Sequence, residues 1–193
     1  MTLKNTNWAF ELKSIACIVA SVLSISAHAN SDLTSANPAA ISASGENGTF
    51  EGRTKAFDND KYSKWLTFSP SGWISYQFDQ PERITNYTIT SANDVPSRDP
   101  QDWQLQGSSD GVNWQTLDVR NNQSFSTRHE TKQFIVSNPA AFKFVRLHVT
   151  ANGGASILQV AEIEMFGSSI VPPPNELPIS HSNTLNAGQW QHW

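Results

Sequence analysis

The sequence is short of cysteine, of charge and of long apolar runs. Its one cysteine, Cys17, cannot form a disulfide within the chain, and a cysteine-ligated zinc site is excluded. Charged residues make up 16% of the 193 residues, the net charge is −4, and no run of Lys or Arg stands out. Nucleic acid is therefore not an expected partner, because binding to phosphates requires a basic surface. No apolar run is long enough for a stable transmembrane helix, so a membrane is not expected as a partner either.

The first residues have the pattern of a secretory signal peptide. Lys4 and Lys13 precede a mostly apolar stretch over 15–25, which ends in Ala27-His28-Ala29. This order of basic, apolar and small residues predicts a signal peptide over 1–29, cleaved after Ala29. The protein is then expected to be secreted or periplasmic. Cleavage would remove Cys17, so the mature chain would need a sizeable core or a metal ion for stability.

The rest of the chain has the sequence pattern of an all-β domain. Residues 30–47, rich in Ala, Ser and Asn, are expected to be a lead-in segment, and 48–167 to be the domain. The clearest period-two alternations are Ile74, Tyr76 and Phe78, and Val145, Leu147 and Val149. Turn signals such as Gln80-Pro81 and Asp110-Gly111 separate them, and no window shows a helical stripe. Many short strands with frequent turns predict a β-sandwich or barrel.

The pattern stops after Gly167. Residues 168–176 contain Pro172-Pro173-Pro174 and are expected to be a stiff Pro-rich linker. The remaining stretch, 177–193, is too short to fold alone. It is either a tail or the start of a further module that is truncated here.

One acidic loop has the chemistry of a calcium site. Asp58, Asp60 and Ser63 offer closely spaced oxygen ligands, which a hard cation such as Ca²⁺ prefers. The loop is not an EF-hand, because Tyr62 occupies a ligand position and Ser69 stands where the closing Glu would be. From the spacing alone, the two aspartates could equally cap a turn.

Seven short motifs occur in an order that is typical of a known family. They are residues 56–65 (AFDND…KW), 72–78 (GWISYQF), 87–94 (YTITSAND), 98–103 (RDPQDW), 105–114 (LQGSSDGVNW), 144–147 (FVRL) and 159–167 (QVAEIEMFG). With them, the stretch 55–167 resembles the F5/8 type C, or discoidin-like, domain, and most closely carbohydrate-binding module family 32. The resemblance implies a jelly-roll β-sandwich of about eight strands in two antiparallel sheets.

The resemblance also implies a structural Ca²⁺ between the first long loop and the last strand. The family's ligands fall on the Lys55 carbonyl, Asp58, the Asp60 carbonyl, Ser63, the Ala161 carbonyl and Glu162. Two carboxylates brought together without a cation would repel each other. A divalent cation would neutralise the two carboxylates and would link two parts of the chain that are distant in sequence.

The best candidates for ligand binding lie in loops. Phe68 could stack on a sugar ring, and Arg98 and Asp99 could hydrogen-bond vicinal hydroxyls. Alternatively, Arg98 and Asp99 pair with each other or with neighbours and fix the loop. Lys55, Asn152 and Phe50 are secondary candidates. Trp65, Trp73, Trp103 and Trp114 sit in family core motifs, so most of them are expected to be packing residues.

Catalytic patterns in the sequence lack their structural context. Residues 107–111 (GSSDG) fit G-x-S-x-G, but a strand rather than a helix is expected to follow, from Val112 to Val119. His129-Glu130 lacks the second histidine of a zinc protease, because residue 133 is Gln. We therefore expect a secreted, non-catalytic module that binds carbohydrate or glycan. The alternatives are a cell-surface adhesion or protein-interaction module, and the targeting module of a larger exported hydrolase.

Overall fold

The computed structural model describes residues 31–169. The expected signal peptide, most of the expected linker and the expected tail lie outside the described residues. Over 31–169 the chain forms nine strands and two short 3-10 turns, and no helix there is long and apolar enough to cross a membrane. The elements are β1 (Ile41–Ala43), η1 (Arg53–Ala56), β2 (Trp65–Thr67), β3 (Gly72–Thr90), η2 (Pro96–Arg98), β4 (Pro100–Ser108), β5 (Gln115–Arg120), β6 (Thr131–Ile135), β7 (Ala141–Asn152), β8 (Leu158–Val160) and β9 (Glu162–Ser169).

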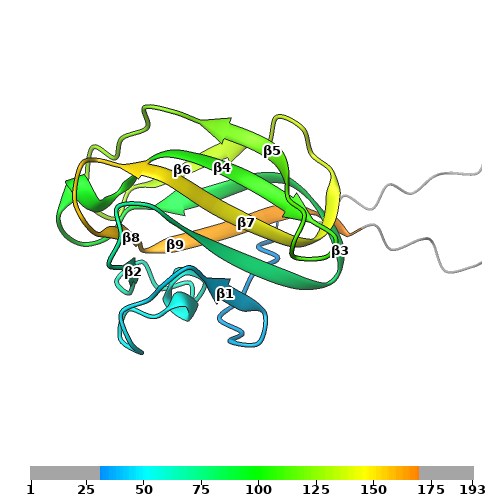
Figure 1. The fold of residues 1–193 in the computed structure, drawn as a ribbon, viewed down its shortest axis with the longest axis horizontal. Helices are drawn as coiled ribbons and strands as arrows, with labels where there is room; N and C mark the ends of the chain where they lie inside the picture. Colours follow the sequence, from blue (N-terminus) through cyan, green and yellow to red (C-terminus); the bar gives the residue numbers. More distant parts are fainter. Residues whose placement is uncertain (1–30, 170–193) are drawn as a thin grey trace, which may run out of the picture.

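The strands form two layers that share one long strand. The first layer has the order β1-β3-β7-β4-β5, and every pairing is antiparallel. The second half of β3, residues 82–90, pairs with β9, and residues 86–90 also pair with β6. Strand β3 therefore crosses from one layer to the other (Figure 1). A separate two-stranded ribbon, β2-β8, lies at one end. The predicted all-β sandwich is confirmed.

The turn expected at Gln80-Pro81 is instead an irregularity inside β3. The pairing between β3 and β7 shifts register between Gln77 and Glu82, at the place where the strand changes layer. Proline has no backbone N–H to donate to a neighbouring strand, so it is tolerated where the ladder is interrupted. The same local sequence can thus end a strand or bend one, and here it bends one.

The expected lead-in segment also contributes to the sheet. β1 pairs with the first part of β3, and the Leu33 N–H donates to the Met165 carbonyl at 2.8 Å. The Asp32 carboxylate accepts the Met165 N–H at 3.1 Å. The sandwich therefore includes residues on the N-terminal side of residue 48, which we expected to be its boundary.

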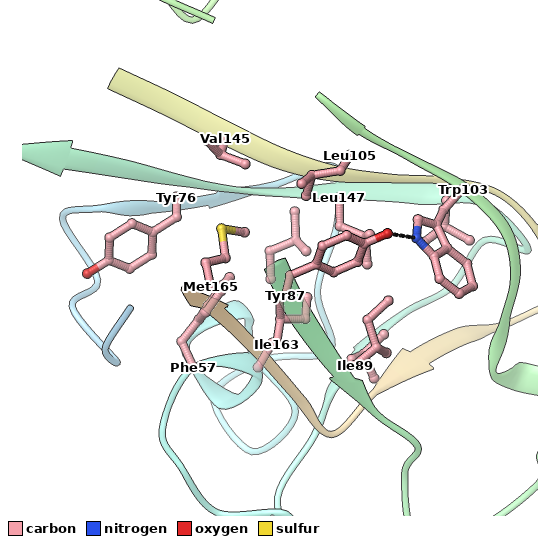
Figure 2. Packing of buried hydrophobic residues seen from close by; sticks show 14 of the residues in the cluster. Phe57, Tyr76, Tyr87, Ile89, Trp103, Leu105, Val145, Leu147, Ile163 and Met165 are labelled. Atoms are coloured by element: carbon pink, nitrogen blue, oxygen red, sulfur yellow. Dashed lines mark hydrogen bonds between the residues drawn. The ribbon is translucent and has the colours of Figure 1, made fainter. Parts of the chain in front are cut away.

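The core fills the space between the layers and contains a buried polar chain. Tyr87, from the second half of β3, faces Trp103 of β4 (Figure 2). The indole Nε1–H of Trp103 donates to the Tyr87 hydroxyl at 2.8 Å, and that hydroxyl lies 2.9 Å from Asp118 Oδ2. Burial raises the pKa of Tyr87, so the phenol stays protonated and donates to Asp118. The two layers are thus joined by packing and by a satisfied hydrogen-bond chain.

Removing the Tyr87 hydroxyl should be costly for its size. In Tyr87→Phe, the indole N–H of Trp103, which is 1% exposed, loses its acceptor. Leaving a buried donor unpaired costs about 2 kcal/mol in the free energy of unfolding, measurable by urea denaturation. Tyr76→Phe is the control, because Tyr76 makes only a 3.2 Å contact with Ser35 near the surface. Equal losses in the two variants would contradict the role given to the Tyr87 hydroxyl.

Two of the four motif tryptophans lie in the buried core, and the other two lie on the outer face of a layer. Trp65 and Trp103 are 0% and 1% exposed. Trp73 and Trp114 are half-buried on the outer face of the first layer, on either side of Arg146. The Arg146 guanidinium carbon lies 4.1 Å from the Trp114 ring centroid and 6.0 Å from that of Trp73. The strand expected from Val112 begins only at Gln115, because a turn held by Asp110 occupies residues 110–113.

Candidate functional site

Several loops meet at the end of the sandwich that carries the β2-β8 ribbon. The loop before β4 and the loop after β7 are bound to each other: the Gly153 N–H donates to the Asp99 carbonyl, and the Ala155 N–H to the Ser97 carbonyl, both at 3.2 Å. These loops gather at the left of Figure 1, whereas β9 ends on the right. Thr67 at the end of β2 pairs with Leu158 of β8, which places Phe68 at this same end.

A compact group of charged side chains lies between these loops. The Lys64 side chain is 9% exposed, and its Nζ lies 2.9 Å from Asp94 Oδ1 and 3.6 Å from Glu51 Oε1. It also donates to Gln159 Oε1 at 3.1 Å. Burial tends to raise the pKa of Asp94, but the hydrogen bond and charge of Lys64 outweigh it and hold that pKa below its ordinary value. Arg98 Nη1 lies 3.8 Å from the other Asp94 oxygen.

The loops of this end also carry exposed apolar side chains. Phe50 is 91% exposed and Phe68 69% exposed. Val95, at the tip of the loop before β4, is 40% exposed and has a φ of +23°. A β-branched residue at positive φ is strained, and such strain persists only where the surroundings hold it. Here the Gln159 amide donates to the carbonyls of Asp94 and Val95, at 2.8 and 3.3 Å.

The predicted ligand-binding residues divide into surface and structural ones. Phe68 and Arg98 reach the surface at the loop end. Asp99 is 4% exposed and forms a bidentate pair with Arg128, with distances of 3.0 and 2.5 Å. Asn152 is 6% exposed and donates to the carbonyls of residues 155 and 157. Asp99 and Asn152 therefore shape the loops, which is the alternative role we weighed for Asp99.

Lys55 belongs to the acidic loop, and its side chain contacts Asp58. Its Nζ is 3.0 Å from Asp58 Oδ2, which raises the pKa of Lys55. The residues that the sequence did not single out are Glu51, Lys64, Asp94 and Gln159. Lys64 and Asp94 are part of the family motifs. Their pairing could not be predicted, because the sequence does not show which charged residues 30 positions apart come into contact.

The acidic loop and the last strand meet, as the predicted metal site requires. Ser63 Oγ lies 2.9 Å from both oxygens of Asp58 and 3.3 Å from the Lys55 carbonyl oxygen. The Asp60 N–H donates to Glu162 Oε1 at 3.0 Å. The Asp60 carbonyl accepts the Ser63 N–H at 2.9 Å, and the Ala161 N–H donates to the Thr90 carbonyl at 3.0 Å. Residues far apart in the sequence thus lie around one point.

The electrostatics of this point favour a cation. Burial and the neighbouring Asp58 raise the pKa of Glu162 to about 9. Glu162 Oε2 is a buried side-chain oxygen without a hydrogen-bond partner. No group of three or more His, Cys, Asp or Glu side chains in this part of the chain could hold a metal ion. A metal here would need carbonyl and hydroxyl oxygens as well, a mixture that Ca²⁺ accepts.

The catalytic patterns of the sequence have other roles in the fold. The serine motif lies in the turn between β4 and β5, where Gly111 has a φ of +74°. In that turn, Ser108 Oγ donates to Asp110 Oδ1 at 2.9 Å. His129 Nδ1 lies 2.7 Å from the Lys61 carbonyl oxygen and links two loops. The serine of the motif, Ser109, is exposed in this turn, and a strand follows it in place of the helix that a hydrolase elbow requires.

Solved structures of sugar-binding modules share this fold. A Clostridium perfringens module, CpGH89CBM32-5, solved in complex with GalNAc-beta-1,3-galactose, is 18% identical with a TM-score of 0.57, covering 66% of this chain and 94% of that chain. A chitosan-binding module of a chitosanase/glucanase from Paenibacillus sp. IK-5 is 19% identical with a TM-score of 0.59, covering 71% and 99%. The described domain therefore has the fold of carbohydrate-binding modules, including those of family 32.

Among curated proteins, the chain resembles part of an enzyme. It is 36% identical over 139 residues to a peptide-N(4)-(N-acetyl-beta-glucosaminyl)asparagine amidase from Arabidopsis thaliana. The match covers 66% of this chain, but it spans only 19% of the amidase. The sequence model of the F5/8 type C domain matches residues 40–163, well over half of the chain. The chain belongs to the F5/8 type C domain family.

Proposed function

We propose that this protein is an exported, non-catalytic carbohydrate-binding module that holds glycans or polysaccharide at its loop end. The observation that carries the proposal is the charged group of Lys64, Asp94 and Arg98 at the end of the sandwich where exposed Phe68 also lies. Arg98 and Asp94 offer donors and acceptors to sugar hydroxyls, while Phe68 offers a face for the apolar side of a sugar ring. The site is shallow, so binding at a single site is expected to be weak.

The loop end is held in place before any ligand arrives. Lys64 donates a hydrogen bond to the Asp94 carboxylate, and Arg128 donates to that of Asp99. The Gln159 amide donates to the Asp94 carbonyl, next to the strained Val95. Groups that are already ordered lose less entropy on binding. This supports a rigid recognition surface rather than a loop that folds around its ligand.

We further propose that Ca²⁺ binds between the acidic loop and β9, with a structural role. The side chains of Asp58, Ser63 and Glu162 and the carbonyls of Lys55, Asp60 and Ala161 would hold it. The buried, unpartnered Glu162 oxygen supports the fit, because a cation would satisfy it. When bound, the ion would supply positive charge that neutralises the two carboxylates.

Glycan binding can be tested on residues 30–170 by affinity electrophoresis in gels containing chitosan, pectin or galactan, followed by a glycan array. We expect retardation by at least one polymer, and a reduction in affinity of about tenfold or more in Arg98→Ala and Phe68→Ala. Val112→Ala is the control, because Val112 is 75% exposed and lies in the turn at residues 110–113. No retardation in any gel and no signal on the array would refute the proposed function.

The curated relative favours one setting for the module. The enzyme's name describes an amidase that acts on N-acetylglucosaminyl-asparagine, and the shared region is a minor part of it. We propose that a module of this kind keeps an attached catalytic domain close to a glycan substrate. Linked binding raises the effective concentration of the substrate without any new contact at the catalytic site.

A further inference from the structure

A second pocket lies on the outer face of the smaller layer, and its lining residues differ from those of the charged group at the loop end. It has a volume of about 330 Å³, enough for one sugar residue. Its walls come from the loop after η1 and from strands β3, β6 and β9. The pocket is lined by Asn59, Asp60, Lys61, Tyr62, Thr90, Thr131, Glu162 and Glu164, so it borders the proposed calcium site at Asp60 and Glu162. Lys61, Tyr62, Thr90, Thr131 and Glu164 are the lining residues outside that proposed metal site that offer an aromatic face, donors and acceptors.

An exposed aromatic ring forms one wall of this pocket. Tyr62 is 72% exposed, and its ring is held edge-on by His129, with centroids 5.0 Å apart. The Lys61 ammonium lies 5.4 Å from the same centroid. Asn59, in the same loop, and His129, in the facing loop, both have a φ of +58°.

The opposite wall offers hydroxyls and a carboxylate. Thr90 Oγ1 and Thr131 Oγ1 are 2.8 Å apart, so one of them donates to the other and one hydroxyl hydrogen remains for a ligand. Glu164 Oε2 accepts a hydrogen bond from Thr88 at 2.7 Å, which leaves further acceptor capacity on the carboxylate. Lys61, which lines the same pocket, supplies donors.

We propose that this pocket is a second sugar-binding site for a neutral pyranose. Tyr62 stacks on the apolar face of the ring, Lys61 donates to hydroxyls, and Glu164 accepts from them. A neutral polyol can use the donors of Lys61 and the acceptors of Glu164 at the same time. The inference rests on the proposed glycan-binding function but on none of the loop-end residues Glu51, Lys64, Phe68, Asp94 and Arg98.

Two sites on one rigid sandwich change how the module meets a polymer. Once one site holds a polysaccharide, binding at the other becomes intramolecular, and avidity exceeds either affinity. The module could also join two glycan chains without forming an oligomer. Disabling one site should therefore weaken retention of the module on a polysaccharide. It should leave the affinity of the other site for a free monosaccharide unchanged.

The test is amide chemical-shift mapping of the ¹⁵N-labelled module with galactose, N-acetylgalactosamine and glucose at millimolar concentration. We expect two groups of shifts, one around Asp94 and Arg98 and one around Lys61, Tyr62 and Thr131. Tyr62→Ala should weaken binding in the second group about tenfold, and Tyr62→Phe should retain it because the stacking face remains. Arg98→Ala should affect only the first group.

The outcomes separate this inference from the proposed function. Shifts at the loop end alone would overturn the second site and leave the proposed function standing. Shifts in the pocket alone would support the second site and overturn the loop-end site. Pocket shifts that survive Tyr62→Ala unchanged, or no shifts with any of the three sugars, would refute the inference. Because Tyr62 is exposed, the variant should keep the wild-type melting temperature.

Discussion

Arg128→Ala should lower the free energy of unfolding by about 3–5 kcal/mol, among the largest effects of any single change in this domain. Arg128 grips both oxygens of Asp99, which is 4% exposed, and its Nη1 also donates to the Asp94 carbonyl at 3.0 Å. Without Arg128, the buried carboxylate of Asp99 would lose the positive charge that pairs with it. Urea denaturation at pH 7 measures the difference.

The same variant should have a characteristic pH dependence. Burial raises the pKa of Asp99 in the folded protein, even though Arg128 opposes this. A carboxyl whose folded pKa exceeds its unfolded one binds protons more tightly when folded, so it adds stability as pH falls through the folded pKa. Removing Arg128 raises that pKa further. The deficit of Arg128→Ala relative to the wild type should therefore be smaller near pH 4 than at pH 7.

Arg98→Ala is the matched control for this experiment. Arg98 lies in the same region but is partly exposed, and its contact with the half-exposed Asp94 is 3.8 Å long. Its loss should cost less than about 1 kcal/mol. A similar cost for both arginines, or a deficit that does not change with pH, would contradict the structural role of the Arg128–Asp99 pair.

The fold could be predicted because its signals are local. The alternation of Ile74, Tyr76 and Phe78 fixes which face of a strand is buried, wherever that strand pairs. The path of β3 could not be predicted in the same way. Gln80-Pro81 is a turn signal in most contexts, and only the pairing of residues 82–90 with β9 makes it a bend within one strand.

The site was less predictable, because burial and partners depend on tertiary structure. Arg98 and Asp99 are adjacent, yet one reaches the surface and the other is buried against Arg128, 29 residues away. The meeting of Asp58 with Glu162 was implied by family resemblance, not by spacing. Tyr62 was noted only as a departure from an EF-hand, since a ring on a loop gives no sign of the pocket beside it.

Calcium should raise the melting temperature by about 10 °C at a concentration about a hundredfold above its dissociation constant. Such saturation adds about 2.7 kcal/mol, and a domain of this size gains about 4 °C per kcal/mol. EDTA should reverse the shift, and a calcium titration followed by calorimetry measures it. A melting temperature that does not respond to calcium or EDTA would exclude the proposed metal.

Glu162→Gln makes the calcium experiment specific to this site. The amide oxygen can still accept the Asp60 N–H that Glu162 Oε1 accepts, so the local fold should survive. Its lost charge should abolish the response to calcium. In EDTA the order of stability should reverse, because the wild type keeps a buried acidic group, 5% exposed, beside Asp58 and the variant does not. The ion would thus convert a destabilising pair of carboxylates into the link between the first long loop and the last strand, and a variant less stable than the wild type in EDTA would contradict that view.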